Sequence, residues 1–152
     1  MYEEWLSNLL ENRQDLNQDA LSRTIHAMNE SVLDCIVGGY QDLIENLVLP
    51  DPDDRHVLAA AIVARANVIV TFNTKDFPKE KIERFGLHAK HPDEFFLDLS
   101  SIDNDEFVAA AMKDLNHYAS PTLTFENYIS GLRKARIPQT ADYINQFKIL
   151  MT

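Results

Sequence analysis

The chain has 152 residues, a net charge of −10 and one cysteine. This length allows one domain of ordinary size with a real core, and a single cysteine excludes an internal disulfide. The acidic charge argues against a protein that coats nucleic acid without specificity, because such proteins are usually basic. It does not argue against a metal-dependent nuclease, because a bound metal ion inverts the local charge of an acidic site.

The sequence contains no apolar run of about 18 residues, so we expect no membrane span. Its first residues, MYEEWLSNLLENR, carry acids where a signal peptide carries basic residues. The lone Cys35 fits a reducing compartment. These features favour a cytoplasmic protein.

The first part of the chain shows helical spacing. Apolar residues recur at helical intervals over residues 3–13 and 17–32, and Asn17 is placed to cap the second of these helices. The break GGY at 38–40 precedes a short helical turn. NLVLP at 46–50 then predicts a short strand.

A helix–strand unit follows. Asp53 or Asp54 is placed to cap a helix over residues 54–66, and NVIVTFN at 67–73 is rich in β-branched residues. Such a continuous apolar run is typical of a strand buried on both faces. A turn, a short helix and the strand LHAK at 87–90 are expected next. The alternation of helices and strands predicts an α/β fold with a parallel sheet flanked by helices.

The sequence is helical from HPDEFF onward. A capping box that begins at Asp103 opens one helix, FENYISGLRKARI at 125–137 forms another, and Pro138 opens the last. We therefore expect an α/β domain over residues 1–98 and a C-terminal helical annex over residues 99–152.

Oxygen-bearing side chains gather at the ends of the central helix–strand unit. Asp51, Asp53 and Asp54 follow the first expected strand, and Asn73 and Asp76 follow the second. The carboxyl ends of parallel strands share one edge of a sheet, so these side chains should lie near one point. Mg²⁺ and Mn²⁺ prefer such oxygen ligands. The same residue types also suit ordinary helix caps and turns, and spacing alone leaves both interpretations open.

Three separated segments resemble the PIN-domain family, the fold of VapC-type toxin nucleases. They are the helix YEEWLSNLL with Glu4, the region of Asp54 with the alanine run 59–61, and VIVTFN followed by KDFP at 75–78. The resemblance covers roughly residues 1–98. The helical tail resembles the extension of a longer bacterial subgroup of the family.

The resemblance implies a metal-dependent endoribonuclease of the toxin–antitoxin type, with Mg²⁺ or Mn²⁺ as cofactor, RNA as substrate and an antitoxin protein as partner. Carried over to this sequence, it makes Glu4 and Asp54 metal ligands, Asn73 and Asp76 supporting site residues, and Asp51 an outer acid of the metal site. Asn73 stands where many family members have Asp, which predicts weaker metal binding.

One departure from the family lies at the start. PIN domains open with an apolar strand that ends in a metal-binding Asp, and this sequence has no counterpart for it. The chain could belong to a longer protein, or a partner chain or a second copy in a homo-oligomer could supply the strand. Alternatively, the sheet has rearranged and the domain is an inactive remnant. The alternative function is then a non-catalytic, PIN-derived protein-interaction module.

Overall fold

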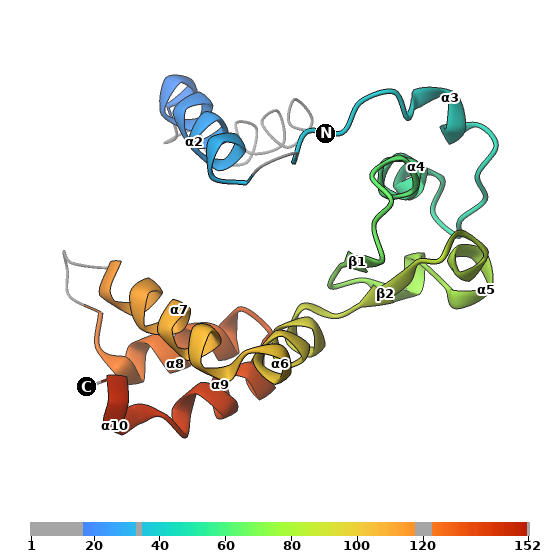
Figure 1. Cartoon of the computed structure of the whole chain (residues 1–152). Coiled ribbons are helices and arrows are strands. Elements are labelled where there is room, and N and C mark those ends of the chain that lie inside the picture. The colour runs from blue at the N-terminus through green and yellow to red at the C-terminus, as the bar shows by residue number, and fades with distance from the viewer. Residues whose placement is uncertain (1–16, 33–34, 118–122, 152) are drawn as a thin grey trace.

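The structure is a computed structural model that describes residues 17–32, 35–117 and 123–151 (Figure 1). The expected helix over residues 3–13, with Glu4, lies outside the described residues. The elements up to the second strand are α2 (Gln18–Ser31), α3 (Gln41–Ile44), η1 (Pro52–Asp54), α4 (Arg55–Val63), β1 (Val68–Val70), η2 (Thr74–Asp76), α5 (Lys79–Ile82), η3 (Glu83–Phe85) and β2 (His88–Lys90). The C-terminal helices are α6 (Pro92–Ile102), α7 (Asn104–His117), α8 (Phe125–Lys134), α9 (Pro138–Asn145) and α10 (Lys148–Met151).

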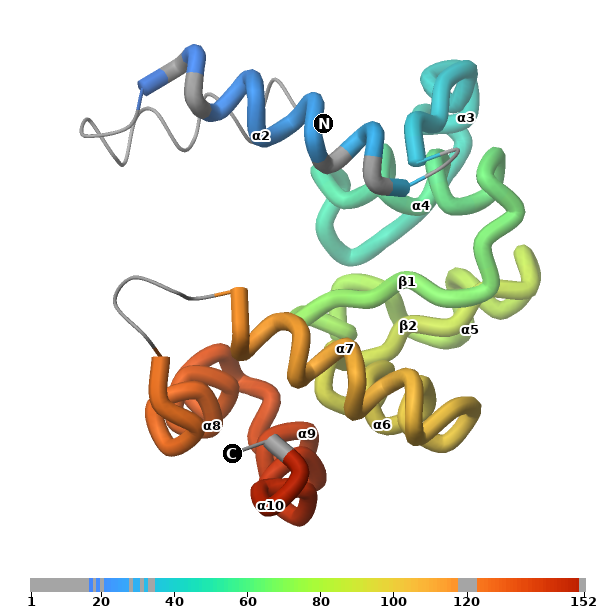
Figure 2. The backbone as a smooth tube through the Cα atoms, turned by 60° about the vertical axis from the view of Figure 1, so that its left-hand side comes forward, coloured from blue at the N-terminus to red at the C-terminus, as the bar shows by residue number. Residues whose placement is uncertain are grey.

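The strands β1 and β2 form a parallel two-stranded sheet, in which Val68 lies opposite His88 and Val70 opposite Lys90. The Thr71 N–H extends the ladder by donating to the carbonyl of Lys90 at 3.0 Å. The sheet confirms the α/β class with parallel strands. In both views α4 lies on one side of the sheet and the C-terminal helices lie on the other (Figure 1 and Figure 2).

A first apolar cluster holds α4, β1 and α5 together. Its buried members are Leu47, Leu49, Leu58, Ala59, Ile69, Phe77, Ile82 and Leu87. Helix α2 contributes no described side chain to this cluster, although Asn17 caps it as predicted by accepting from the Asp19 N–H at 2.8 Å. None of the helices in the described ranges combines the length and the apolar character needed to cross a membrane.

The predicted strand at residues 46–50 is wrong. The segment buries Leu47 and Leu49 and exposes Val48, which is the alternation of a strand. Yet its backbone makes no ladder bond to β1 within the described residues, and the Leu47 N–H donates instead to Ile44. A strand needs a neighbouring strand for its hydrogen bonds, and side-chain pattern alone cannot show whether one is present.

The strand β1 is shorter than predicted and is buried on one face only. Ile69 packs in the first cluster at 6% exposure, whereas Val70 and Phe72 are 43% and 45% exposed. Burial of both faces requires a layer on each, and in the described part of the chain these two side chains have an open face. The preceding helix α4 also ends earlier than predicted, at Val63.

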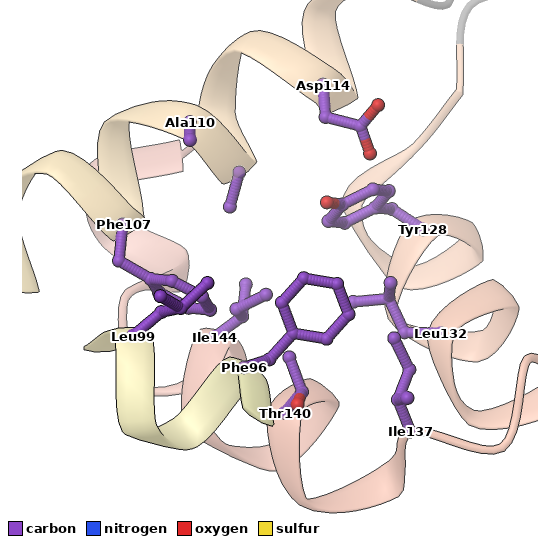
Figure 3. A pocket seen from close by; sticks show the side chains of 11 residues that line it. Phe96, Leu99, Phe107, Ala110, Asp114, Tyr128, Leu132, Ile137, Thr140 and Ile144 are labelled. Carbon is purple, nitrogen blue, oxygen red and sulfur yellow. The ribbon is translucent and has the colours of Figure 1, made fainter. Parts of the chain in front are cut away.

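The C-terminal helices have a cluster of their own. Its buried members are Ala111, Leu115, Phe125, Tyr128, Ile129, Ala141 and Ile144. Between α6, α7, α8 and α9 lies an apolar cavity of about 370 Å³, with the carboxylate of Asp114 and the hydroxyl of Tyr128 on one side (Figure 3). The single last helix expected after Pro138 is instead two helices, α9 and α10. The expected domain division between residues 98 and 99 lies within α6 and stays a prediction.

A buried carboxylate joins α6 to α9. Asp93 is 3% exposed and accepts hydrogen bonds from the Gln139 N–H at 2.9 Å, the Thr140 N–H at 2.7 Å and the Thr140 hydroxyl at 2.7 Å. Burial raises the pKa of Asp93, but the bonds from Thr140 and Gln139 outweigh this effect, so the pKa lies below its ordinary value. Asp93 thus caps the start of α9 from another helix.

Candidate functional site

The first side of the candidate site is the turn that leads into α4. Asp51 accepts from the Asp53 N–H at 2.9 Å and so caps η1, where Pro52 occupies the first position. Asp54 lies at the junction of η1 and α4, and its side chain makes no capping bond. Asp54 thus occupies the N-cap position of α4, as one of the two predicted candidates, but the side-chain capping bond is made by Asp51 to η1 instead. The Asp54 carboxylate is left available for other contacts.

The second side of the site is the turn after β1. The Asn73 N–H donates to the hydroxyl oxygen of Thr71 at 3.1 Å, and the Asn73 side-chain amide donates to the carboxylate of Asp76. Phe77 is buried in the first cluster and anchors the turn. Asn73 therefore orients Asp76 through its amide nitrogen.

The two sides meet at Asp54 and Asp76, whose carboxyl groups are close enough to share a hydrogen bond. We call these two residues the acidic pair. Burial raises the pKa of Asp54, and the negative charges of Asp76 and Asp51 raise it further, while His56 acts in the opposite direction. Because the folded pKa of Asp54 exceeds its unfolded value, its contribution to stability is present at low pH and is lost as the pH rises through the folded pKa. At neutral pH the acidic pair thus opposes folding.

The structure brings together most of the site residues expected from the sequence. Asp54, Asn73 and Asp76 are joined by hydrogen bonds, and Asp51 is near enough to act on Asp54 electrostatically. Glu4 lies outside the described residues. Within the described ranges, no three His, Cys, Asp or Glu side chains form a group that could hold a metal ion.

The acidic pair could still take part in binding a divalent ion. Mg²⁺ in proteins is commonly held by one or two carboxylates, keeps several waters and takes further oxygens from substrate phosphates. Two carboxylates whose mutual repulsion raises the pKa of Asp54 match this donor set, because a cation between them would relieve that repulsion.

An aromatic and cationic group beside the acidic pair escaped the sequence analysis. The guanidinium carbon of Arg136 lies 5.0 Å from the centre of the Phe72 ring, and the His91 ring meets Phe72 edge-on with 5.2 Å between ring centres. Phe72 precedes Asn73 directly, but Arg136 comes from the loop between α8 and α9. No sequence signal pairs such distant residues.

Two comparisons with known proteins each found a match. Residues 92–146, from the start of α6 onward, match the model of the family described as VapC50 C-terminal domain. The chain is 37% identical over 103 residues to a Mycobacterium tuberculosis (strain ATCC 25618 / H37Rv) protein named "Putative ribonuclease VapC50", and the match covers 68% of this chain and 60% of that protein. No solved structure matches the chain.

The fold and site define a class: an α/β protein with a parallel sheet, one carboxylate at the start of a helix beside another in the turn after a strand, and a set of C-terminal helices. Together with the two matches, they place the chain more narrowly. Its C-terminal helices match the VapC50 C-terminal domain, and the chain is similar to a VapC-type protein, of which it spans 60% of the length.

Proposed function

We propose that this chain acts as a metal-dependent endoribonuclease of the toxin–antitoxin type. The single observation that carries the proposal is the proximity of Asp54, at the start of α4, to Asp76, in the turn after β1. The chain is also similar to a protein named as a ribonuclease. The sheet and flanking helices are compatible with a PIN-like architecture, which belongs to the same proposal. RNA is the proposed substrate, and an antitoxin protein is the proposed partner.

Each residue of the site has a proposed role. Asp54 and Asp76 bind Mg²⁺ or Mn²⁺, Asn73 fixes the orientation of Asp76, and Asp51 adds negative charge at the edge. Glu4 is proposed as a further ligand from the first residues of the chain. When bound, the ion supplies an activated water and neutralises charge on the phosphate. The acidic pair binds and places that ion, and the turn after β1 keeps the pair in position.

Cleavage of a labelled single-stranded RNA by the purified protein tests the proposal. We expect cleavage with Mn²⁺ and none with excess EDTA, because no ion pair neutralises either carboxylate among the residues that the structure describes. Restoring Mn²⁺ after EDTA should restore cleavage. Equal cleavage with and without EDTA would contradict metal dependence, and a folded protein inactive under every metal condition would contradict the proposed activity.

A second candidate is a protein-interaction module, and one observation favours it. The edge of β1 that faces away from β2 pairs with no strand in the described part of the chain. Val70 of β1 is also 43% exposed. A free strand edge with apolar neighbours can accept a strand from another chain, whether from a partner or from a second copy. A folded protein that binds a partner but leaves RNA intact would support this function.

A further inference from the structure

The side chain of Phe72 is unusually accessible for a residue at the end of a strand. It is 45% exposed, while Ile69 in the same strand is buried in the first cluster. The His91 ring packs against it in a T-shaped arrangement, with 5.2 Å between ring centres, and so helps to hold the ring in place. An aromatic ring that is both held and exposed can stack on a flat ligand.

Arg136 lies over this ring in a strained backbone conformation. Its φ of 66° lies in the left-handed region that favours glycine. The Arg136 N–H donates to Arg133 and the Ile137 N–H donates to Leu132, which is the hydrogen-bond pattern of a Schellman motif. Glycine is the usual residue at this position of the motif. Arg65 occupies the same kind of position, so the contact of the Arg136 side chain with Phe72, rather than its backbone, sets Arg136 apart.

The guanidinium of Arg136 has no carboxylate partner in the part of the chain that the structure describes. Arg133, one turn earlier, pairs with Asp142 at 2.7 Å, but Arg136 makes no ion pair within the described residues. Its guanidinium instead lies 5.0 Å from the centre of the Phe72 ring. A planar cation beside an exposed aromatic ring is a combination that proteins use to hold unpaired nucleotides, since the ring stacks on a base and the cation attracts phosphate.

The position of this group relative to the acidic pair is fixed by the chain itself. Phe72 and Asn73 are adjacent, so their Cα atoms lie about 3.8 Å apart. Asn73 in turn donates to Asp76, which contacts Asp54. Phe72 and the turn that carries Asp76 therefore belong to one short, continuous segment of the chain.

We propose that Phe72 and Arg136 form a stacking platform that holds one unpaired RNA base beside the acidic pair. The C-terminal helices thereby contribute a substrate-binding residue, Arg136, to a site on the sheet. This inference rests on the proposed ribonuclease function and names the residues that position its substrate. In this platform Phe72 contacts the base, and His91 positions the Phe72 ring. Arg136 holds the same ring in place and attracts the phosphate.

The test measures binding of a short, fluorescently labelled single-stranded RNA of mixed sequence. All variants carry Asp54→Asn so that the RNA stays intact. Phe72→Leu keeps an apolar side chain but removes the ring, and Phe72→Tyr keeps the ring. Arg136→Gly removes the charge while relieving the backbone strain, so loss of binding cannot come from loss of folding.

The chain offers a matched control at Arg65. Arg65 is exposed, has a φ of 52° and ends α4 with the same pattern, since its N–H donates to Ile62 and the Ala66 N–H donates to Ala61. No cation–π contact joins it to an aromatic ring in the described part of the chain. Arg65→Gly therefore makes the same change of charge and backbone away from the platform.

We expect Phe72→Leu and Arg136→Gly to raise Kd about 5- to 100-fold, and Phe72→Tyr and Arg65→Gly to stay within about twofold of their background. With Asp54 restored, Phe72→Leu should raise KM more than it lowers kcat. Two results would contradict the platform while leaving the proposed function intact, provided that the parent cleaves RNA. One is unchanged RNA binding by Phe72→Leu, and the other is a loss of RNA affinity in Arg65→Gly as large as that in Arg136→Gly. If the parent neither binds nor cleaves RNA, both fail.

Discussion

The Asp54→Asn protein is expected to cleave single-stranded RNA at least about 100-fold more slowly than the parent with Mn²⁺. The substitution removes one of the two carboxylates of the acidic pair, and loss of an electrostatic contribution of about 3 kcal/mol to the transition state lowers a rate by about this factor. Initial rates at saturating RNA measure the effect. Activity within a few-fold of the parent would contradict the role of Asp54.

Two controls separate loss of chemistry from loss of folding. Asp54 makes no capping bond, and its burial beside Asp76 and Asp51 raises its pKa. We therefore expect Asp54→Asn to raise the free energy of unfolding at neutral pH by on the order of 0.5 kcal/mol. Asp53→Asn makes the same chemical change one residue earlier. We expect it to keep cleavage within about twofold, because no bond joins the Asp53 side chain to the acidic pair in the described residues.

Replacing Asp93 by alanine is expected to lower the free energy of unfolding by about 3 to 4 kcal/mol at neutral pH. The substitution removes three hydrogen bonds to a buried carboxylate. It leaves the N–H of buried Thr140 without its carboxylate partner, and leaves the Thr140 hydroxyl only its longer bond of 3.4 Å to the backbone carbonyl of residue 93. Such a loss is a large fraction of the stability of an ordinary domain. Denaturant unfolding followed by circular dichroism measures it.

The matched control for Asp93 is Glu94→Ala, which removes an equal charge from the same turn of α6 at an exposed position. We expect it to change stability by no more than about 0.5 kcal/mol. Because the folded pKa of Asp93 is lowered, the stability that it contributes is present above the unfolded pKa and is lost as the pH falls through the folded value. The difference between Asp93→Ala and the parent should therefore shrink in strong acid, and an equal difference at all pH values would contradict this account.

The convergence of Asp54, Asn73 and Asp76 could be predicted from the sequence because it depends on local rules. Asn73 and Asp76 follow β1, whose position the apolar pattern indicates, and a short turn leaves little freedom for what comes next. Asp54 is expected nearby because of a second parallel strand at residues 46–50, and the structure brings it there without that strand. The hydrogen-bond roles could not be predicted at that level. Asp51, rather than its neighbours, caps the turn, and Asn73 presents its amide nitrogen to Asp76.

Features that depend on distant parts of the chain were beyond the sequence. The alternation of Leu47, Val48 and Leu49 correctly indicates which side chains are buried, but the hydrogen bonds of a strand depend on a neighbour that the alternation does not reveal. The contact of Phe72 with Arg136 likewise requires α8 and α9 to be placed against the sheet. A non-glycine residue at positive φ also leaves no mark in the sequence.

The central claim is that Asp54 and Asp76 hold one divalent ion. Binding of Mn²⁺ tests this claim most directly, and electron paramagnetic resonance measures the binding as loss of the free-ion signal. The proteins to compare are the parent, Asp54→Asn and Asp53→Asn. We predict that the parent and Asp53→Asn bind Mn²⁺ alike and that Asp54→Asn loses at least about tenfold in affinity. Equal binding by all three proteins would contradict the claim.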